Sequence, residues 1–312
     1  MNTSHQDDSF QLAQKANTLR LRASLISSLR RFFCKHDFLE VETPLRIPSP
    51  APEEYIEAIP SGGWFLQTSP ELCMKRLLAA GYPRIFQICK CFRADERGSL
   101  HLPEFTMLEW YVARFNYHQL MDQCEALLCD AFKNLGHDST IRWKNRTIRI
   151  EPRWERITVA EAFEKYAPAG LREALDADRF DEIMVECIEP NLGVNRPTFI
   201  YDYPAPLAAL ARLKKENRNF AERFELYIGG LELANGFSEL TDADEQRQRF
   251  EEALNKREAK NWSRYTLPEK FLQSLSDMPE SAGIALGVDR LAMILTGAST
   301  IDDVTAFPPE RL

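Results

Sequence analysis

The chain has 312 residues, of which 44% are hydrophobic and 28% are charged, as in an ordinary soluble globular protein. Its formal net charge of −8, from 39 basic and 47 acidic residues, argues against a protein that mainly grips a long nucleic acid, because phosphate contacts need surplus Lys and Arg. No stretch approaches the roughly 18 consecutive apolar residues of a transmembrane helix, and the polar N-terminus lacks the pattern of a signal peptide. We therefore expect a cytoplasmic protein that does not engage a membrane.

The first part of the chain alternates between helical and extended patterns. Residues 1–16 are a polar tail, and residues 19–38 carry Leu and Phe at helical spacing, which predicts an amphipathic helix. Residues 38–52 are extended and rich in proline. Residues 62–81 predict a strand and then a helix, with Ser69 as N-cap and Pro70 as first helical residue. Residues 84–96 predict a strand that leads into a charged turn.

The rest of the chain supplies most of the expected sheet. Helices are expected over residues 117–135, 158–188 and 241–260, and strands over 142–151 and 197–204. Residues 223–240 indicate two strands joined at Gly229–Gly230, and 283–297 a strand that turns into a helix at a glycine. We see no repeat or linker. The pattern predicts one α+β domain over residues 17–312, with a mostly antiparallel sheet flanked by helices.

The seven cysteines do not form a pair of CxxC units, so a zinc site is not expected. Cys89 and Cys91 are two positions apart on a predicted strand and should share a face. We expect buried free thiols, the usual state of such residues.

The segment "FRADERGSLHLPEFTMLEWY" (92–111) places charged groups around a turn. Arg93 can offer forked donors to a carboxylate and a phosphate, and the turn at Gly98–Ser99 brings His101 back toward it. Phe105 offers a flat face for a base, while Glu109 and Tyr111 point the same way from one strand. Alone, the segment also fits a solvated hairpin.

Two further segments add complementary groups. In "GIALGVDRLAMIL" (283–295), small residues let a ligand approach the backbone. Arg290 lies at the start of a helix, where a cation is unfavourable unless an anion such as a triphosphate compensates its charge. An ion pair between Arg290 and an acidic residue explains the position equally well. In "FELYIGGLELANGFSEL" (224–240), Glu225 and Glu232 form a possible magnesium site, and Glu239 suits an ammonium group; plain acidic surface is the alternative. Together, these segments predict a site that activates a carboxylate with ATP, with Glu71, Glu109 and Glu239 left for a cationic substrate.

With these residues in place, the chain resembles the catalytic domain of class II aminoacyl-tRNA synthetases of the lysyl type. "FLEVETPLRI" resembles motif 1, which forms the dimer interface, with its proline at Pro44. The 92–111 segment resembles motif 2, and "GIALGVDRL" resembles motif 3 with its arginine at Arg290. The resemblance runs from about residue 17 to 308 and implies a homodimer.

A lysyl-tRNA synthetase also carries an N-terminal OB-fold that reads the anticodon, and here the sequence opens almost directly on the motif 1 helix. The chain is therefore most similar to the truncated paralogs, the elongation factor P–(R)-β-lysine ligases. The resemblance implies a ligase that uses ATP and Mg2+ to activate (R)-β-lysine or lysine. The activated group then goes to a lysine of elongation factor P, without recognition of a tRNA anticodon.

The resemblance implies roles for individual residues. The catalytic residues would be Arg93 and Arg290. The ATP contacts would be Arg93, Asp95, Glu96, His101, Phe105, Glu232, Leu233, Gly287 and Arg290. The substrate contacts would be Ser69, Pro70, Glu71, Glu109, Tyr111, Asn235, Phe237, Glu239 and Ala285. The metal ligands would be Glu225 and Glu232.

Three positions depart from the lysyl-tRNA synthetase pattern. Asp95 stands where the family usually has a glutamate, whose side chain is one carbon longer, and Glu96 could take the role of that glutamate. Leu102 stands where an asparagine is usual, which removes one polar contact. Ala285 stands where those synthetases have glycine, and its methyl group favours an amine one carbon further along the substrate.

Other functions remain open on the sequence. A minimal synthetase that charges tRNA would share these motifs, as would an inactive synthetase relic that serves as a binding module. An amide synthetase similar to the asparagine enzyme is a third alternative, against which the lysine-pocket residues argue. The sequence does not decide the preference between α- and β-lysine, the acceptor lysine, or the base for the transfer step.

Overall fold

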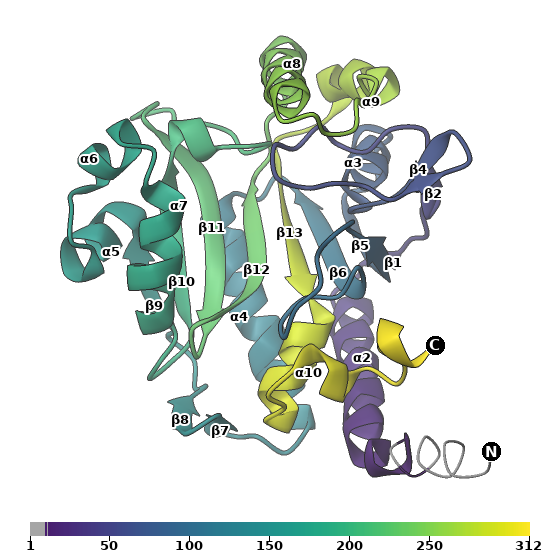
Figure 1. Cartoon of the computed structure of the whole chain (residues 1–312), viewed down its shortest axis with the longest axis vertical. Helices are drawn as coiled ribbons and strands as arrows, with labels where there is room; N and C mark the ends of the chain where they lie inside the picture. The colour runs from purple at the N-terminus through teal and green to yellow at the C-terminus, as the bar shows by residue number, and fades with distance from the viewer. Residues whose placement is uncertain (1–9, 11) are drawn as a thin grey trace.

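The structure is a computed structural model that describes residue 10 and residues 12–312 (Figure 1). Most of the expected polar tail, residues 1–16, lies outside the described residues. Helix α2 (Ala16–Lys35) confirms the predicted amphipathic helix, and it buries Leu25, Leu29 and Phe33 against the sheet.

An eight-stranded sheet forms the centre of the molecule, in the order β1-β5-β6-β13-β12-β11-β10-β9. The strands, in that order, are β1 (Leu39–Glu40), β5 (Arg84–Phe92), β6 (Glu104–Ala113), β13 (Ser281–Gly287), β12 (Leu231–Ser238), β11 (Phe220–Ile228), β10 (Thr198–Pro204) and β9 (Glu155–Thr158). Only the outermost pairs, β1 with β5 and β9 with β10, are parallel. The mostly antiparallel α+β prediction is therefore confirmed.

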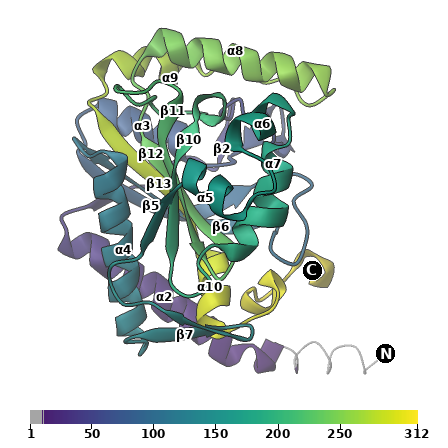
Figure 2. The same cartoon turned by 90° about the vertical axis from the view of Figure 1, so that its left-hand side faces the viewer.

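Helices cover the sheet in three groups (Figures 1 and 2). The helices are α2, α3 (Glu71–Ala79), α4 (Tyr117–Asn134), α5 (Val159–Tyr166), α6 (Leu171–Asp176), α7 (Phe180–Ile183), α8 (Ala243–Ala259), α9 (Glu269–Ser274) and α10 (Val288–Thr296). One group, α2, α4 and α10, forms the largest core with one face of the sheet. The second, α5 to α7, packs on β10, and the third, α3, α8 and α9, lies at one end of the strands.

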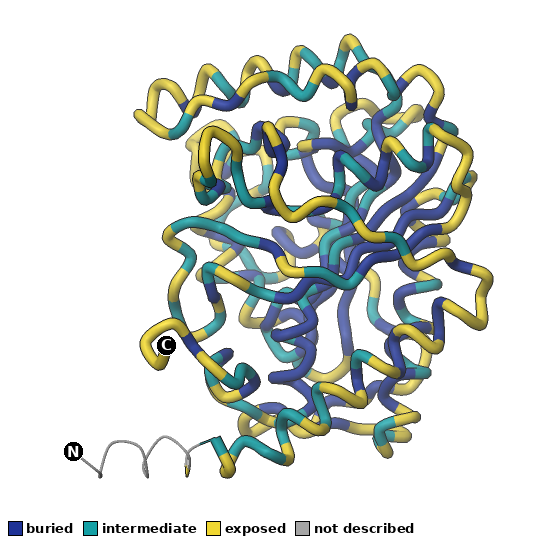
Figure 3. Tube along the Cα trace, turned by 90° about the vertical axis from the view of Figure 1, so that its right-hand side faces the viewer, coloured by how far each residue is buried: buried dark blue, intermediate teal, exposed yellow. Residues whose placement is uncertain are grey.

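Short helical turns connect these elements. They are η1 (Met184–Ile188, a π-turn), η2 (Glu189–Asn191), η3 (Ala205–Leu207), η4 (Leu275–Asp277), η5 (Ile301–Val304) and η6 (Pro309–Arg311). Figure 3 shows that the central strands are buried whereas the outward side of α8 is exposed. Among the described residues, no helix combines the length and the apolar character needed to cross a bilayer.

Two small sheets accompany the large one. The first pairs β4 (Trp64–Leu66) with β2 (Arg46–Ile47) and β3 (Pro60–Ser61). The second is a hairpin of β7 (Thr140–Trp143) and β8 (Arg146–Arg149), so the single strand predicted over 142–151 is wrong. Lys144, with φ of 51°, turns the chain back where no glycine marks a turn.

Both elements that carry glycine turns were predicted correctly. Gly229 and Gly230 join β11 to β12 with φ of 64° and 79°, and a Cβ on Gly229 would lie 2.4 Å from the Trp143 ring. Glycine is therefore required there. Strand β13 ends at Gly287, where α10 begins.

The start of α3 differs by one residue from the prediction. The helix begins at Glu71, with Pro70 rather than Ser69 at the cap position. The Ser69 hydroxyl still accepts a hydrogen bond from the Glu71 N–H at 3.0 Å, so it satisfies one of the free donors of the first turn.

All seven cysteines are free, and the Sγ atoms of Cys89 and Cys91 lie 4.0 Å apart on one face of β5, as predicted. The expectation of burial holds fully only for Cys91 and Cys124, since Cys34 is exposed and the others are half-buried.

Candidate functional site

A cavity of about 710 Å3 lies on the face of the sheet opposite to α2, α4 and α10. Side chains alternate along each strand. On β6, Leu108 and Trp110 enter the core, whereas Glu109 and Tyr111 face the cavity. Glu109 pairs in register with Ala285 of β13, which pairs with Asn235 of β12, and the three form one row across the cavity floor.

Most of the predicted site residues line this one cavity. They are Ser69, Glu71, Arg93, Glu96, His101, Phe105, Glu109, Tyr111, Glu225, Glu232, Leu233, Asn235, Phe237, Ala285, Gly287 and Arg290. The loop at residues 52–56 and the inner side of α8 close its other walls.

Three predicted residues do not line the cavity, each for a local reason. Pro70 caps α3, and its carbonyl accepts from Cys73 and Met74. Asp95 is exposed on a turn with φ of 61°, so Glu96 faces the cavity in its place. Glu239 is fully buried behind the cavity floor.

Two arginines stand at one end of the cavity. Arg93, just after β5, lies 3.6 Å from Glu96 and places its guanidinium 5.1 Å from the centre of the Phe105 ring. Its Nε is buried without a hydrogen-bond partner in the described part of the chain. An unused donor of this kind fits an anionic ligand, since buried donors are normally satisfied.

Arg290 is held in the first turn of α10. It donates to the backbone oxygen of Glu232 at 2.9 Å and to its carboxylate at 3.3 Å, and its Nη2 lies 2.5 Å from Nε2 of His101. Burial and the Arg290 charge lower the pKa of His101, so this ring is neutral near pH 7 and accepts from the arginine. The alternative drawn from the sequence, that Arg290 pairs with an acid, holds too, and that acid is Glu232.

Asp289 instead ties three elements together. Its Oδ1 accepts from Arg22 of α2 at 2.7 Å, and its Oδ2 accepts from the Thr106 N–H of β6 at 2.6 Å. The first turn of α10, and with it Arg290, is thereby fixed to the motif 1 helix and to the motif 2 strand.

The opposite end of the cavity is rich in carboxylates. Glu109 is 1% exposed, and its carboxylate accepts hydrogen bonds from the Ser69 hydroxyl at 2.6 Å and from the Tyr111 hydroxyl at 3.0 Å. Burial and the nearby Glu71 nevertheless raise the pKa of Glu109 to about 8. Burial likewise raises the pKa of Glu239 to about 8, although Lys75 opposes this. A buried carboxylate with a raised pKa is one that gains from a cation.

Lys75 is a buried cation between two of these acids. Its Nζ lies 2.5 Å from Glu71 and 2.5 Å from Glu239, and its side chain is almost fully enclosed. Burial lowers its pKa, but Glu239 and Glu71 outweigh that effect and the pKa is raised, so Lys75 stays charged. Neither oxygen of Glu239 has a hydrogen bond of good geometry among the described residues.

The two candidate metal ligands lie near each other. Burial and then the charge of Glu232 raise the pKa of Glu225, which accepts from Arg223 at 2.7 Å and from Tyr227 at 2.9 Å. Glu232 is more exposed and faces Arg290. Two carboxylates beside an arginine-lined phosphate position fit Mg2+, which takes one or two carboxylates together with phosphate oxygens and water.

Of the two glycines of β13, Gly283 has a different role from the one predicted, whereas Gly287 agrees with the prediction. A Cβ on Gly283 would lie 2.2 Å from the Tyr111 ring and 2.5 Å from Glu239, so this glycine makes room for the protein's own side chains. A Cβ on Gly287 would meet nothing closer than 3.8 Å, so this glycine leaves open space at the cavity wall.

Sequence reasoning missed several charged residues of the site. Lys75 follows Glu71 by one helical turn, a spacing that can reveal such a pair. Arg223 precedes Glu225 on the same face of β11, as strand alternation can reveal. Glu53 lies in an irregular loop, and no local pattern marks it.

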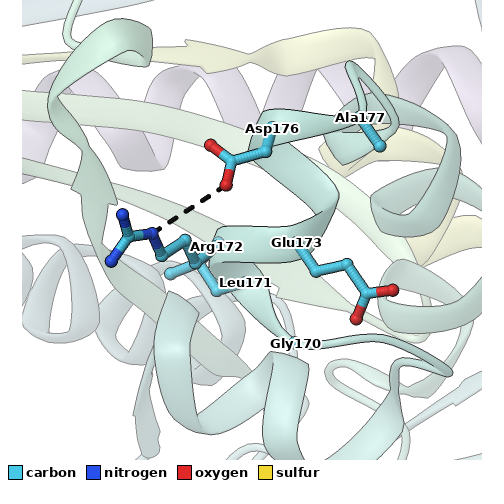
Figure 4. A pocket seen from close by; sticks show the side chains of 6 residues that line it. All are labelled: Gly170, Leu171, Arg172, Glu173, Asp176 and Ala177. Atoms are coloured by element: carbon cyan, nitrogen blue, oxygen red, sulfur yellow. Dashed lines mark ion pairs between the residues drawn. The ribbon is translucent and has the colours of Figure 1, made fainter.

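A second hollow, beside α6, has about the same volume but a different character (Figure 4). It is lined by one short segment, 170–177, in which Arg172 and Asp176 pair at 3.9 Å while both are largely exposed. With no converging buried groups, it is a surface feature.

Comparison with known proteins agrees with this geometry. The profile of the family described as "tRNA synthetases class II (D, K and N)" matches residues 9–311. The chain belongs to this family. A protein of Pectobacterium atrosepticum is 41% identical over 96% of this chain and 97% of its own length. Proteins of Pectobacterium carotovorum subsp. carotovorum and Sodalis glossinidius are each 40% identical over at least 95% of both chains.

Each of these three relatives is named "Elongation factor P--(R)-beta-lysine ligase". The expected membership of the class II synthetases, in the group formed by these ligases, is thereby confirmed. As a member of that group, the chain is an enzyme of the ligase class, and its central sheet is the class II fold.

Proposed function

We propose that this enzyme uses ATP to activate (R)-β-lysine, or lysine, as an aminoacyl adenylate, and transfers the acyl group to a lysine side chain of elongation factor P. The names of its relatives support this proposal. The structural observation that carries it is one cavity with two arginines at one end and buried carboxylates at the other. Such a cavity suits a molecule with a reacting carboxylate at one end and an ammonium group at the other.

In the first half-reaction, the substrate carboxylate attacks the α-phosphate of ATP and pyrophosphate leaves. No general base is needed, because a carboxylate is ionised near pH 7. Arg93 and Arg290 bind the phosphates and stabilise the charge that develops on them, and Phe105 stacks on the base. Glu225 and Glu232 would hold Mg2+, which supplies further neutralisation of phosphate charge when bound.

The carboxylate end selects a substrate with two ammonium groups. Glu71 and Glu109 face the cavity, and Glu239 lies behind its floor. When ionised, the three carry three negative charges, and Lys75 offsets one of them. The remaining two match the two ammonium groups of lysine or β-lysine. The Ala285 methyl group, in the row between Glu109 and Asn235, favours the amine of β-lysine over that of α-lysine.

In the second half-reaction, the neutral amine of the acceptor lysine attacks the adenylate carbonyl and AMP leaves. We further propose a cytoplasmic homodimer in which residues 17–312 form one catalytic domain that reads no anticodon. All seven cysteines are free, which agrees with a reducing compartment.

The test measures which molecule receives the label from a labelled substrate. The protein is incubated with ATP, Mg2+, labelled (R)-β-lysine or lysine, elongation factor P and tRNA together. We expect label on elongation factor P, its loss in Arg290→Ala, and no change in Arg172→Ala, which alters an exposed arginine beside α6. Label on tRNA would indicate a minimal synthetase, and no label with no pyrophosphate exchange would indicate an inactive relic.

A further inference from the structure

Glu53 is an acid of the cavity wall that the proposed mechanism does not yet use. It lies in the loop between β2 and β3 and is half-buried. Within the described residues, its carboxylate makes no hydrogen bond or ion pair, and only its backbone oxygen is engaged, accepting from Arg257 at 2.8 Å.

The loop that carries Glu53 is held firmly in place. Arg257 of α8 is fully buried and donates to the backbone oxygens of Glu53 and Ile56 at 2.8 and 2.7 Å, and it pairs with the Glu57 carboxylate. The neighbouring Glu54 is bound by Lys256 of α8 at 2.8 Å and by Lys260, just after α8, at 3.0 Å. Of the three acids in this loop, Glu53 is the one left to act on a ligand.

Charged groups from both ends of the cavity act on Glu53. They are Glu71 and Lys75 of α3, Arg93 after β5, and Arg223 of β11. Glu71, from the ammonium end, and Arg93, from the phosphate end, line the same cavity as Glu53, so its carboxylate faces the space that the adenylate would occupy. Burial and then Glu71 raise its pKa to about 7, a value suited to exchanging a proton near neutral pH.

We propose that the Glu53 carboxylate accepts the proton that the acceptor amine must lose in the transfer half-reaction; this inference rests on the proposed function. The amine nitrogen forms a bond to the adenylate carbonyl carbon and becomes a charged ammonium. That ammonium passes one proton to Glu53, the bond from carbon to the phosphate oxygen breaks, and AMP leaves. An amide remains, and Glu53 returns its proton to water.

The carboxylates assigned to the substrate and to the metal ion are already engaged. Glu109 accepts from Ser69 and Tyr111, Glu71 pairs with Lys75, and Glu225 is held by Arg223. Glu53 therefore combines position, a free carboxylate and a suitable proton affinity.

The experiment measures the two half-reactions separately in single turnover. Pyrophosphate release without elongation factor P reports adenylate formation, and addition of elongation factor P to the preformed adenylate reports transfer. In Glu53→Gln, we expect adenylate formation to stay within about twofold and transfer to fall about 100-fold, at the lower end of typical general-base effects. Glu53→Asp should recover part of the transfer rate, and Glu216→Gln, at an exposed glutamate that does not line the cavity, serves as the control with both rates unchanged.

The pH dependence of the transfer rate is a second measurement, and it would not change in Glu53→Gln if Glu53 had only a structural role. In the wild type, the logarithm of the rate should rise steeply below about pH 7, where both Glu53 and the acceptor amine lose protons, and less steeply above it. In Glu53→Gln, only the shallower rise should remain.

Two results would overturn the inference. An equal fall of both half-reactions in Glu53→Gln would make Glu53 a ligand of the substrate ammonium, and an unchanged transfer rate would leave it without a role. Absence of adenylate in the wild type is a different failure, because it removes the proposed function itself and the inference with it.

Discussion

At the residue scale, the carboxylates of the cavity determine how binding depends on pH. Burial raises the pKa of Glu109 to about 8 in the free protein, so this carboxylate is largely protonated at neutral pH. An ammonium group stabilises its ionised form. Binding of lysine or β-lysine should therefore release protons, and affinity should rise as the pH increases toward 8.

This prediction is measured by titration calorimetry near neutral pH in two buffers with different ionisation enthalpies. We expect a net release of protons, reduced in Glu109→Gln because the carboxylate that loses its proton is then missing. Glu104→Gln, on the same strand but largely exposed, is the matched control and should behave like the wild type. An observed heat that is independent of the buffer would contradict the assignment of these acids to the ammonium groups.

At the element scale, Arg257 joins α8 to the loop that walls the cavity. Its guanidinium is enclosed and satisfied by two backbone oxygens of the loop and by Glu57. Removing it would leave Glu57 and the two oxygens without their donor. We expect Arg257→Ala to lower the free energy of unfolding by about 3–5 kcal/mol, as for other broken buried pairs.

The measurement is urea unfolding of Arg257→Ala beside Arg247→Ala. Arg247 lies on the same helix and pairs with Glu269 at 2.6 Å, but both side chains are exposed. Its loss should change the unfolding free energy by no more than about 0.5 kcal/mol. Equal effects of the two substitutions would show that the loop is not held by Arg257.

Local patterns explain which elements were predictable. Gly229–Gly230 mark their turn because both take a positive φ that other residues rarely adopt, and helical spacing identified α2. The β7–β8 hairpin was missed because its strands are short and Lys144 turns the chain without a glycine. Local patterns could not predict the contacts of Lys75 with Glu239 or of Arg257 with Glu53, because each contact joins segments distant in sequence.

At the scale of the whole molecule, the edge of the sheet formed by β1 leaves apolar surface uncovered. Leu39, Leu45 and Trp64 are 50%, 44% and 47% exposed around this edge, in the region of motif 1. Exposed apolar side chains beside an unpaired strand favour association. We propose that a second copy of the chain covers them.

Light scattering after size exclusion tests this proposal. The wild type should have twice the mass of one chain, and Leu39→Lys should shift it toward one chain by placing a charge in the contact. Val185→Lys is the control, because Val185 is also an exposed apolar residue, at 60%, but belongs to η1, in the group of helices that packs on β10. A single-chain mass for the wild type would contradict the dimer.

The most direct test of the proposed function is the intact mass of elongation factor P after incubation with this enzyme, ATP, Mg2+ and (R)-β-lysine or lysine. We expect an increase of one lysyl group, faster with (R)-β-lysine because of Ala285, and no increase with Arg290→Ala. An unchanged mass with both substrates, under conditions in which the wild type forms the adenylate, would contradict the assignment of elongation factor P as the acceptor.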